Sequence, residues 1–275
     1  MRRGGLALGL GLIGAIVAMA ALSLVWTPYP VDAIDVAGRL AGPSATHWLG
    51  TDHFGRDILT LILAGARTAV VVGLIAVGAG MAVGVAVGAA AAGAGGVLDE
   101  ALMRLSDAAF AFPAVVSALL ITSLFGAGTL NAMIAIAIFN VPVFARTTRS
   151  AARQAWRRDH VRAAVALGKS RLAVTRDHVL PTIAGVLVVQ GALQFGLAIL
   201  AEAALSYLGI GAQPPEPSWG RMLNDAQTYL FGQPWLALYP GLAISLAVLG
   251  CNLVGDGLRD GLDPRLRRVV RRLAT

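Results

Sequence analysis

The sequence predicts an all-α membrane protein with six transmembrane helices, and three observations carry that prediction. Hydrophobic residues make up 57% of the 275 residues and charged residues only 13%, which is too little charge to cover a soluble protein of this length. Six stretches are apolar over close to the roughly 20 residues that a spanning helix needs. The basic residues gather in alternate segments between these stretches, as they do in a chain that crosses a membrane repeatedly.

The six predicted spans lie at residues 6–26, 68–92, 110–126, 130–145, 183–206 and 236–254. The third and fourth are the shortest, and only Gly126-Ala127-Gly128 separates them, which predicts a tight helical hairpin. The first span has a cleavable signal peptide as its alternative, because Arg2 and Arg3 precede it. Its apolar run is long for a signal peptide, and Trp26 and Tyr29 suit a membrane interface, so we expect a retained helix.

The positive charges predict the orientation. With the amino terminus inside, 18 of the 22 Lys and Arg residues fall in inner segments, and the outer segments hold only Arg39, Arg56, Arg67 and Arg221. Because short basic loops stay on the cytoplasmic side, both termini are predicted to be cytoplasmic. The same distribution explains the net charge of +7 without nucleic acid as a partner.

The chain divides into three predicted parts: residues 1–67, with the first helix and an outer loop; residues 68–265, the main transmembrane domain; and residues 266–275, a basic cytoplasmic tail. Residues 58–66 of the outer loop are apolar but too short to span. We therefore predict an interfacial helix there, with Asp57 near its start and Arg67 reaching to the lipid headgroups.

The outer loop holds four side chains of types that bind metals: His47, Asp52, His53 and Asp57. Their spacing matches no strong metal motif, so we predict no metal site and assign them turn-forming and capping roles. Cys251 has no second cysteine to pair with in this chain, and it is interpreted as a small packing residue.

Polar residues inside the predicted spans are few. Glu202, near the outer end of the fifth span, is the ionisable exception, whereas ion-coupled transporters usually keep acids or histidines near the midplane. Gln190 and Gln194 share a helix face, and two roles fit them equally: lining a path for polar cargo, or hydrogen bonding between helices. Glycines at every fourth position over residues 80–88 allow close helix approach, either between chains or within this one.

The loop between the fourth and fifth spans begins with four arginines at gaps of 3, 4 and 4. They form one stripe on a helix that continues the fourth span, and the stripe also suits anionic lipid: Arg146, Arg149, Arg153 and Arg157.

The rest of this loop predicts two short helices at a sharp angle. Asp159 is expected to cap the first, over residues 159–168, and Gly168 to end it in the left-handed conformation. The second starts at Ser170 and must end before Pro181. The first has one apolar face, formed by Val161, Ala164, Val165 and Gly168. Such a knob fits a partner's groove, and nothing in it is catalytic.

Part of the same loop, Gly168-Lys169-Ser170, matches the end of a phosphate-binding loop. The full signature needs a glycine where Ala163 stands, so we reject nucleotide binding by this chain.

The loop resembles the shared cytoplasmic motif of the membrane permease subunits of ABC importers. That motif reads Glu-Ala-Ala, three residues, Gly, nine residues, Ile, any residue, Leu-Pro, and Ala163-Ala164, Gly168 and Leu180-Pro181 fall at matching spacings. Arg162 replaces the acid and His178 replaces the Ile. Both departures are similar to the dipeptide, oligopeptide and nickel branch of the family.

Further stretches over residues 48–265 are similar to the dipeptide-permease C type of that branch: His47-Trp48-Leu49-Gly50-Thr51-Asp52 with Gly55-Arg56-Asp57, Gly65-Ala66-Arg67, Met103-Arg104 with Phe112-Pro113, Leu205-Ser206-Tyr207-Leu208-Gly209, Pro217-Ser218-Trp219-Gly220, Gly255-Asp256-Gly257 and Asp263-Pro264-Arg265. The resemblance implies a type I importer permease fold in a prokaryotic cell membrane. It also implies that residues 159–168 are the coupling helix, with these ATPase-contacting residues: Asp159, Arg162, Ala163, Ala164, Gly168, Leu180 and Pro181.

The resemblance further implies the partners. A homologous second permease completes the pathway, two cytoplasmic ATPases bind ATP and Mg²⁺, and an extracytoplasmic binding protein delivers the cargo. The cargo is expected to be di- or oligopeptides, with nickel or another small cargo as the alternative. A secondary transporter and a non-transporting scaffold are the alternatives from other classes, and the scarcity of midplane charge argues against the first.

Overall fold

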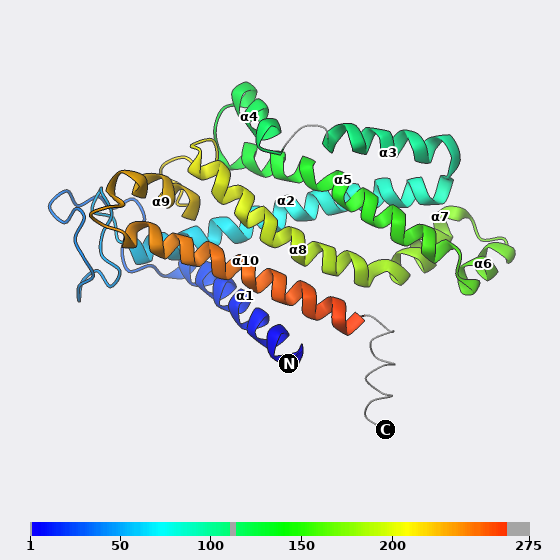
Figure 1. Ribbon diagram of the computed structural model, residues 1–275, viewed down its shortest axis with the longest axis horizontal. Coiled ribbons are helices and arrows are strands. Elements are labelled where there is room, and N and C mark those ends of the chain that lie inside the picture. The colour runs from blue at the N-terminus through cyan, green and yellow to red at the C-terminus, as the bar shows by residue number, and fades with distance from the viewer. Residues whose placement is uncertain (1, 111–113, 263–275) are drawn as a thin grey trace.

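The computed structural model describes residues 2–110 and 114–262, and within them the regular secondary structure is helical (Figure 1). The α-helices are α1 Arg2–Val25, α2 Ile58–Ala94, α3 Gly96–Phe110, α4 Ala114–Phe125, α5 Thr129–Trp156, α6 Asp159–Ala166, α7 Arg171–Val174, α8 Leu180–Tyr207, α9 Trp219–Ala226 and α10 Trp235–Leu262. A π-helical turn, Thr175–Val179, joins α7 to α8, and a 3-10 turn, Gln227–Tyr229, follows α9. The predicted basic tail, residues 266–275, lies outside the described residues.

Five helical stretches of the described chain are long and apolar enough to cross a membrane: Gly4–Val25, Ile58–Ala94, Thr129–Trp156, Arg171–Tyr207 and Trp235–Gly261. Within the third predicted span, residues 110–126, positions 111–113 lie outside the described residues, and the rest contains α4, which has 12 residues. At 1.5 Å per residue a helix of that length is about 18 Å long, short of the roughly 30 Å hydrocarbon core. The structure therefore supports five of the six predicted spans. Gly126-Ala127-Gly128 forms the predicted tight link from α4 to α5.

The predicted interfacial helix over residues 58–66 is wrong as a separate element. Asp57 caps a helix start, as expected, and its carboxylate accepts the Thr60 N–H at 2.8 Å, but the helix then runs unbroken to Ala94. Ile58 and Ala66 are fully buried. This segment is apolar because it packs inside the protein, and the predicted boundary after residue 67 falls within α2.

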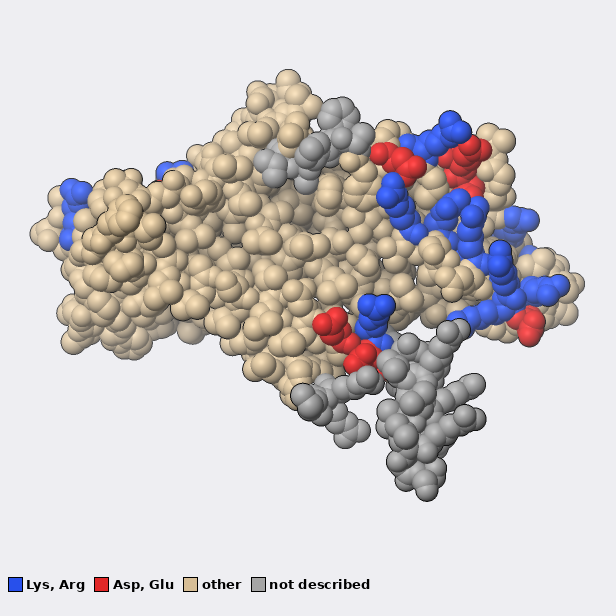
Figure 2. Space-filling model, viewed as in Figure 1, with Lys and Arg blue, Asp and Glu red and all other residues tan. Residues whose placement is uncertain are grey.

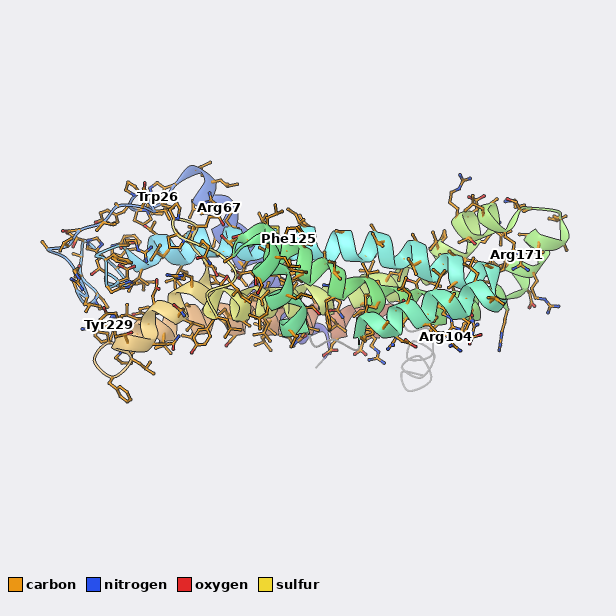
Figure 3. All side chains as sticks on the ribbon, turned by 90° about the horizontal axis from the view of Figure 1, so that it is seen from above. Trp26, Arg67, Arg104, Phe125, Arg171 and Tyr229 are labelled. Atoms are coloured by element: carbon orange, nitrogen blue, oxygen red, sulfur yellow. The ribbon has the colours of Figure 1, made fainter. Side chains whose placement is uncertain are left out.

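The long helices form an elongated bundle with two distinct ends (Figure 1). One end, here the basic end, carries α6 and α7; the opposite, or loop end, carries the segment between α1 and α2 together with α9. In Figure 3, Trp26 and Tyr229 lie toward the loop end, and Arg104 and Arg171 toward the basic end. The long apolar helices therefore separate the basic end from the loop end.

The glycines of α2 serve packing within the chain, which decides between the two predicted roles. A Cβ at Gly84 would lie 2.5 Å from the Val141 carbonyl oxygen, and a Cβ at Gly88 would lie 2.3 Å from the Ala145 carbonyl oxygen. Both distances are too short for a non-bonded contact of a Cβ, so only glycine lets α2 and α5 approach this closely.

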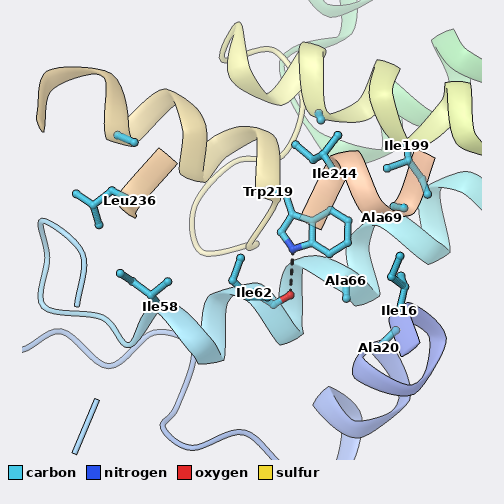
Figure 4. Packing of buried hydrophobic residues seen from close by; sticks show 13 residues of the cluster. Ile16, Ala20, Ile58, Ile62, Ala66, Ala69, Ile199, Trp219, Leu236 and Ile244 are labelled. Atoms are coloured by element: carbon cyan, nitrogen blue, oxygen red, sulfur yellow. Dashed lines mark hydrogen bonds between the residues drawn. The ribbon is translucent and has the colours of Figure 1, made fainter. Parts of the chain in front are cut away.

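Trp219 packs into the bundle near the loop end and holds α9 against it (Figure 4). Its indole N–H donates to the Ile62 carbonyl oxygen at 3.0 Å, and its ring lies over Gly65, where a Cβ would come within 2.6 Å. The surrounding cluster joins α1, α2, α8, α9 and α10 through residues such as Ile16 and Ile244. Burying so large a side chain fixes α9 against the spans.

Candidate functional site

Charged side chains gather at the basic end, and the middle of the face seen in Figure 2 is nearly free of them. The predicted continuation of the fourth span is confirmed, because α5 runs on to Trp156 and carries three of the four arginines of the stripe. Arg157, the fourth, is the residue at the carboxyl end of α5.

Three arginines of the stripe form ion pairs with acidic residues of α3. Arg149 Nη2 donates to Asp99 Oδ2 of α3 at 2.8 Å, and Arg153 pairs with the same carboxylate. Asp99 is buried, and its hydrogen bond from Arg149 holds the pKa of that carboxyl below its ordinary value. Arg146 pairs with Asp107 and lies over the Phe110 ring, 4.4 Å from its centroid. The stripe therefore docks α3 onto α5.

The first helix of the basic-end loop is α6, and its start differs from the prediction by one residue. Arg158 occupies the cap position without a side-chain hydrogen bond, and Asp159 is the first helical residue. The Asp159 carboxylate still suits the positive end of the helix dipole. Val161 and Ala164 of the predicted apolar face are buried, in one cluster with residues of α5, α7 and the first part of α8.

Gly168 ends α6 as predicted, with φ of +82°. Its N–H donates to the Val165 carbonyl oxygen at 2.9 Å, and the Lys169 N–H donates to the Ala164 carbonyl oxygen at 3.3 Å. This pair of bonds is the Schellman motif, which satisfies the last carbonyls of a helix and reverses the chain direction. The chain therefore reverses direction between α6 and α7 at the basic end, and we call residues 165–172 the tip.

The second helix begins as predicted but does not end before Pro181. Ser170 caps α7 by accepting the Ala173 N–H at 3.3 Å. The chain then passes through a π-helical turn, in which the Leu180 N–H reaches the Thr175 carbonyl oxygen, directly into α8. Pro181 is tolerated because it follows this widened turn at the start of α8, where a proline ring has room and a missing N–H costs little.

The predicted coupling residues lie on or beside this tip. Arg162, Ala163 and Gly168 are exposed, Pro181 is exposed at the start of α8, and Leu180 is half-buried, whereas Ala164 faces inward.

Two exposed residues of the tip were not found from the sequence. Leu167 is 85% and Leu172 is 80% exposed, and Val165 nearby is 45% exposed. Both leucines flank the turn at Gly168, outside the apolar face set by helical periodicity. The sequence signal that could have identified them is the presence of large apolar residues on both sides of Gly168, the predicted left-handed glycine.

The outer motif folds into a compact turn at the loop end. Asp52 Oδ1 accepts the N–H groups of Phe54 at 2.8 Å and Arg56 at 2.9 Å, and Asp52 Oδ2 accepts from Arg56 Nε at 2.7 Å. Gly55 has φ of +79°, and a Cβ there would lie 1.8 Å from the Asp35 carbonyl oxygen. The turn therefore requires glycine and a carboxylate at these positions.

Asp57 and His47 complete the outer turn, with His47 Nδ1 3.0 Å from Asp57 Oδ1. Asp57 also caps α2, so the predicted capping role is confirmed. Among the described residues no group of three or more His, Cys, Asp or Glu side chains is placed to hold a metal ion.

Glu202 lies at the loop end of α8, buried and hydrogen-bonded. It accepts from the Ser206 hydroxyl at 2.7 Å and from the Ser218 hydroxyl at 2.8 Å. Ser218 also caps α9. Glu202 thus ties α8 to α9 and does not stand free in a pathway.

The structure separates the two glutamines of α8. Gln194 is buried and lines a cavity between α4, α5 and α8, together with Asn140. Gln190 is half-buried and is not part of that lining.

Residues 80–268 match the family described as the binding-protein-dependent transport system inner membrane component, over more than half of the chain. The chain belongs to this family. It is therefore a membrane-embedded permease subunit of an ABC importer, a multi-pass protein of the inner membrane, as the motifs predicted.

Among known relatives, the permease is 41% identical over 259 residues to the dipeptide transport system permease protein DppC of Alkalihalophilus pseudofirmus, with 94% of this chain and 85% of the relative covered. It is 38% identical over 247 residues to the glutathione transport system permease protein GsiD of Pectobacterium atrosepticum, covering 88% and 82%. It is 45% identical over 226 residues to GsiD of Shigella flexneri, covering 82% and 75%.

Proposed function

We propose that this permease imports short peptides, di- or oligopeptides, as one half of a pathway that a homologous second permease completes. The named cargoes of its relatives, dipeptides and glutathione, are both peptides, which supports this class over nickel or another small cargo. An extracytoplasmic binding protein delivers the peptide, and two ATPase subunits bind ATP and Mg²⁺. This chain carries no cofactor of its own in this proposal.

The observation that carries the proposal is the uncovered apolar tip at the basic end. Val165, Leu167 and Leu172 are exposed beyond the bundle, where no part of the described chain covers them. Apolar side chains exposed on a loop beyond the spanning helices indicate a protein interface. We assign it to the groove of an ATPase, with Arg162 and Ala163 beside it.

The anchoring of α6 supports a mechanical role. Val161 and Ala164 are buried against α5 and the start of α8, so a displacement of the tip is transmitted to both spans. ATP-driven closure of the ATPases would then switch the spans between inward- and outward-facing arrangements. A secondary transporter would need its own ion site, and Glu202 is already satisfied by two serines.

The basic end is the cytoplasmic side in this proposal, with both termini there and anionic lipid around its arginines. The loop end then faces the binding protein. Asp52, Gly55, Arg56 and Asp57 shape the first outer loop that the binding protein meets.

A double substitution at the tip tests this function. With Leu167→Ser and Leu172→Ser, we expect peptide uptake by the reconstituted complex to fall at least about tenfold, because the ATPase loses its apolar contact. Uptake of a tritiated dipeptide and ATP hydrolysis stimulated by the loaded binding protein are both measured in proteoliposomes.

Leu105→Ser is the matched control, since Leu105 is 71% exposed on α3, outside the loop that forms the tip. Normal uptake and normal stimulated hydrolysis in the tip variant would refute the coupling assignment.

A further inference from the structure

A cavity of about 250 Å³ lies between α4, α5 and α8, on the side of α8 away from α10. Most of its lining is apolar, including Ala118, Ile136, Phe139, Leu197, Ala201 and Ala204. Two carboxamide residues, Asn140 and Gln194, are its polar members, and none of its lining residues is ionisable.

Both carboxamides are buried without a full set of hydrogen bonds. Gln194 is 7% exposed, and its amide has no hydrogen-bond partner within the described chain. Asn140 is 2% exposed; its amide nitrogen donates to the Ile136 carbonyl oxygen at 2.9 Å, but its oxygen accepts no bond from a described residue. Buried polar groups are nearly always paired. The Asn140 oxygen is closed off inside the protein, so the Gln194 amide is the group that points to a missing ligand.

The chemistry of the lining selects the ligand class. A carboxamide both donates and accepts hydrogen bonds, and a peptide group complements it in both respects. A charged group would lose its hydration here without an opposite charge, so the charged ends of a bound peptide must lie outside the apolar lining. A lipid chain would leave Gln194 unpaired. The apolar remainder of the wall suits a small aliphatic side chain.

We propose that this cavity holds one uncharged peptide group of the cargo, hydrogen-bonded to Gln194. A neighbouring side chain of the cargo then packs against the apolar residues of α4 and α8. This proposal rests on the proposed import of peptides and adds where and how the permease recognises them. A site that reads the peptide group accepts many side chains, so it distinguishes peptides from other cargo without fixing their sequence.

The position of the cavity also links it to the tip. It is lined by α5 and α8, the same two helices against which α6 is anchored at the basic end. A displacement of α6 that shifts α5 against α8 would therefore change the cavity. ATPase closure and cargo release would be coupled through those two helices.

The test uses the full importer complex in proteoliposomes, with tritiated alanyl-alanine and its analogue methylated on the peptide nitrogen. The affinity of the binding protein for each dipeptide is measured separately, and the ratio of the two uptake rates is corrected by the ratio of these affinities. Gln194→Leu should lower alanyl-alanine uptake by about 2- to 10-fold and abolish the remaining preference over the methylated analogue. ATP hydrolysis stimulated by the loaded binding protein should stay near normal.

Ala201→Leu should also lower uptake by filling the cavity, whereas Ala184→Leu, on an exposed part of the same helix outside the lining, should not. Normal uptake in both Gln194→Leu and Ala201→Leu overturns the proposal. Loss of the second permease on purification of either variant also overturns it, because the cavity would then be a subunit contact. Failure of the unaltered complex to take up any dipeptide refutes the peptide cargo instead.

Discussion

Gly168 shows how a single residue sets the shape of the coupling tip. Its φ of +82° lies in the left-handed region, and no atom lies within 4 Å of where a Cβ would stand. A side chain there would meet no steric clash with neighbours, so any effect of substitution is conformational. A β-branched residue pays about 1–3 kcal/mol for this backbone conformation, while asparagine tolerates it.

We predict that Gly168→Val uncouples transport and Gly168→Asn largely preserves it. The valine variant should lose most uptake and most stimulated ATP hydrolysis in proteoliposomes, because the turn that presents Leu167 and Leu172 no longer forms. Equal activity of the two variants would show that the left-handed cap is unimportant for coupling.

At the scale of elements, the sequence predicted what depends on local pattern. The arginine stripe, the Asp57 cap, the Gly168 turn and the start of α7 at Ser170 were all read from spacing and residue type. The errors came where packing outweighs pattern. Residues 58–66 looked interfacial because their burial under Trp219 is not visible in the sequence.

The continuation of α7 into α8 was missed for a related reason. A proline normally ends a helix, and the π-helical turn that accommodates Pro181 depends on the whole loop geometry. The cavity around Gln194 could not be predicted either, because its walls come from three helices whose packing the sequence does not show. Only the shared face of Gln190 and Gln194 was visible beforehand.

The α2–α5 seam gives a prediction at the element scale. Gly84→Val should lower the thermal unfolding temperature of the purified permease by several degrees, because the new side chain would force the two backbones apart at a cost of about 1–3 kcal/mol. Gly78→Val on the same helix is the control, since Gly78 is exposed with nothing within 4 Å. Equal shifts in the two variants would mean that helix propensity, and not the seam, is responsible.

For the whole molecule, the proposed direction across the membrane follows from the charge distribution along the bundle axis. The basic end holds α6, α7 and the arginines of α5, and the loop end holds the Asp52 turn and α9 (Figures 1 and 2). Peptide import driven from the cytoplasm requires the tip and the ATPases on one side and the binding protein on the other. The proposal therefore depends on orientation as much as on any single contact.

Orientation is tested by cysteine labelling in intact cells. Ala45→Cys in the first outer loop and Ala166→Cys at the end of α6 both introduce exposed thiols, while the native Cys251 is buried. A membrane-impermeant maleimide should label Ala45→Cys from outside, and Ala166→Cys only after the membrane is permeabilised, because positive charge retains the basic end in the cytoplasm. Labelling of Ala166→Cys in intact cells would place the tip outside, where no ATP-driven subunit could reach it.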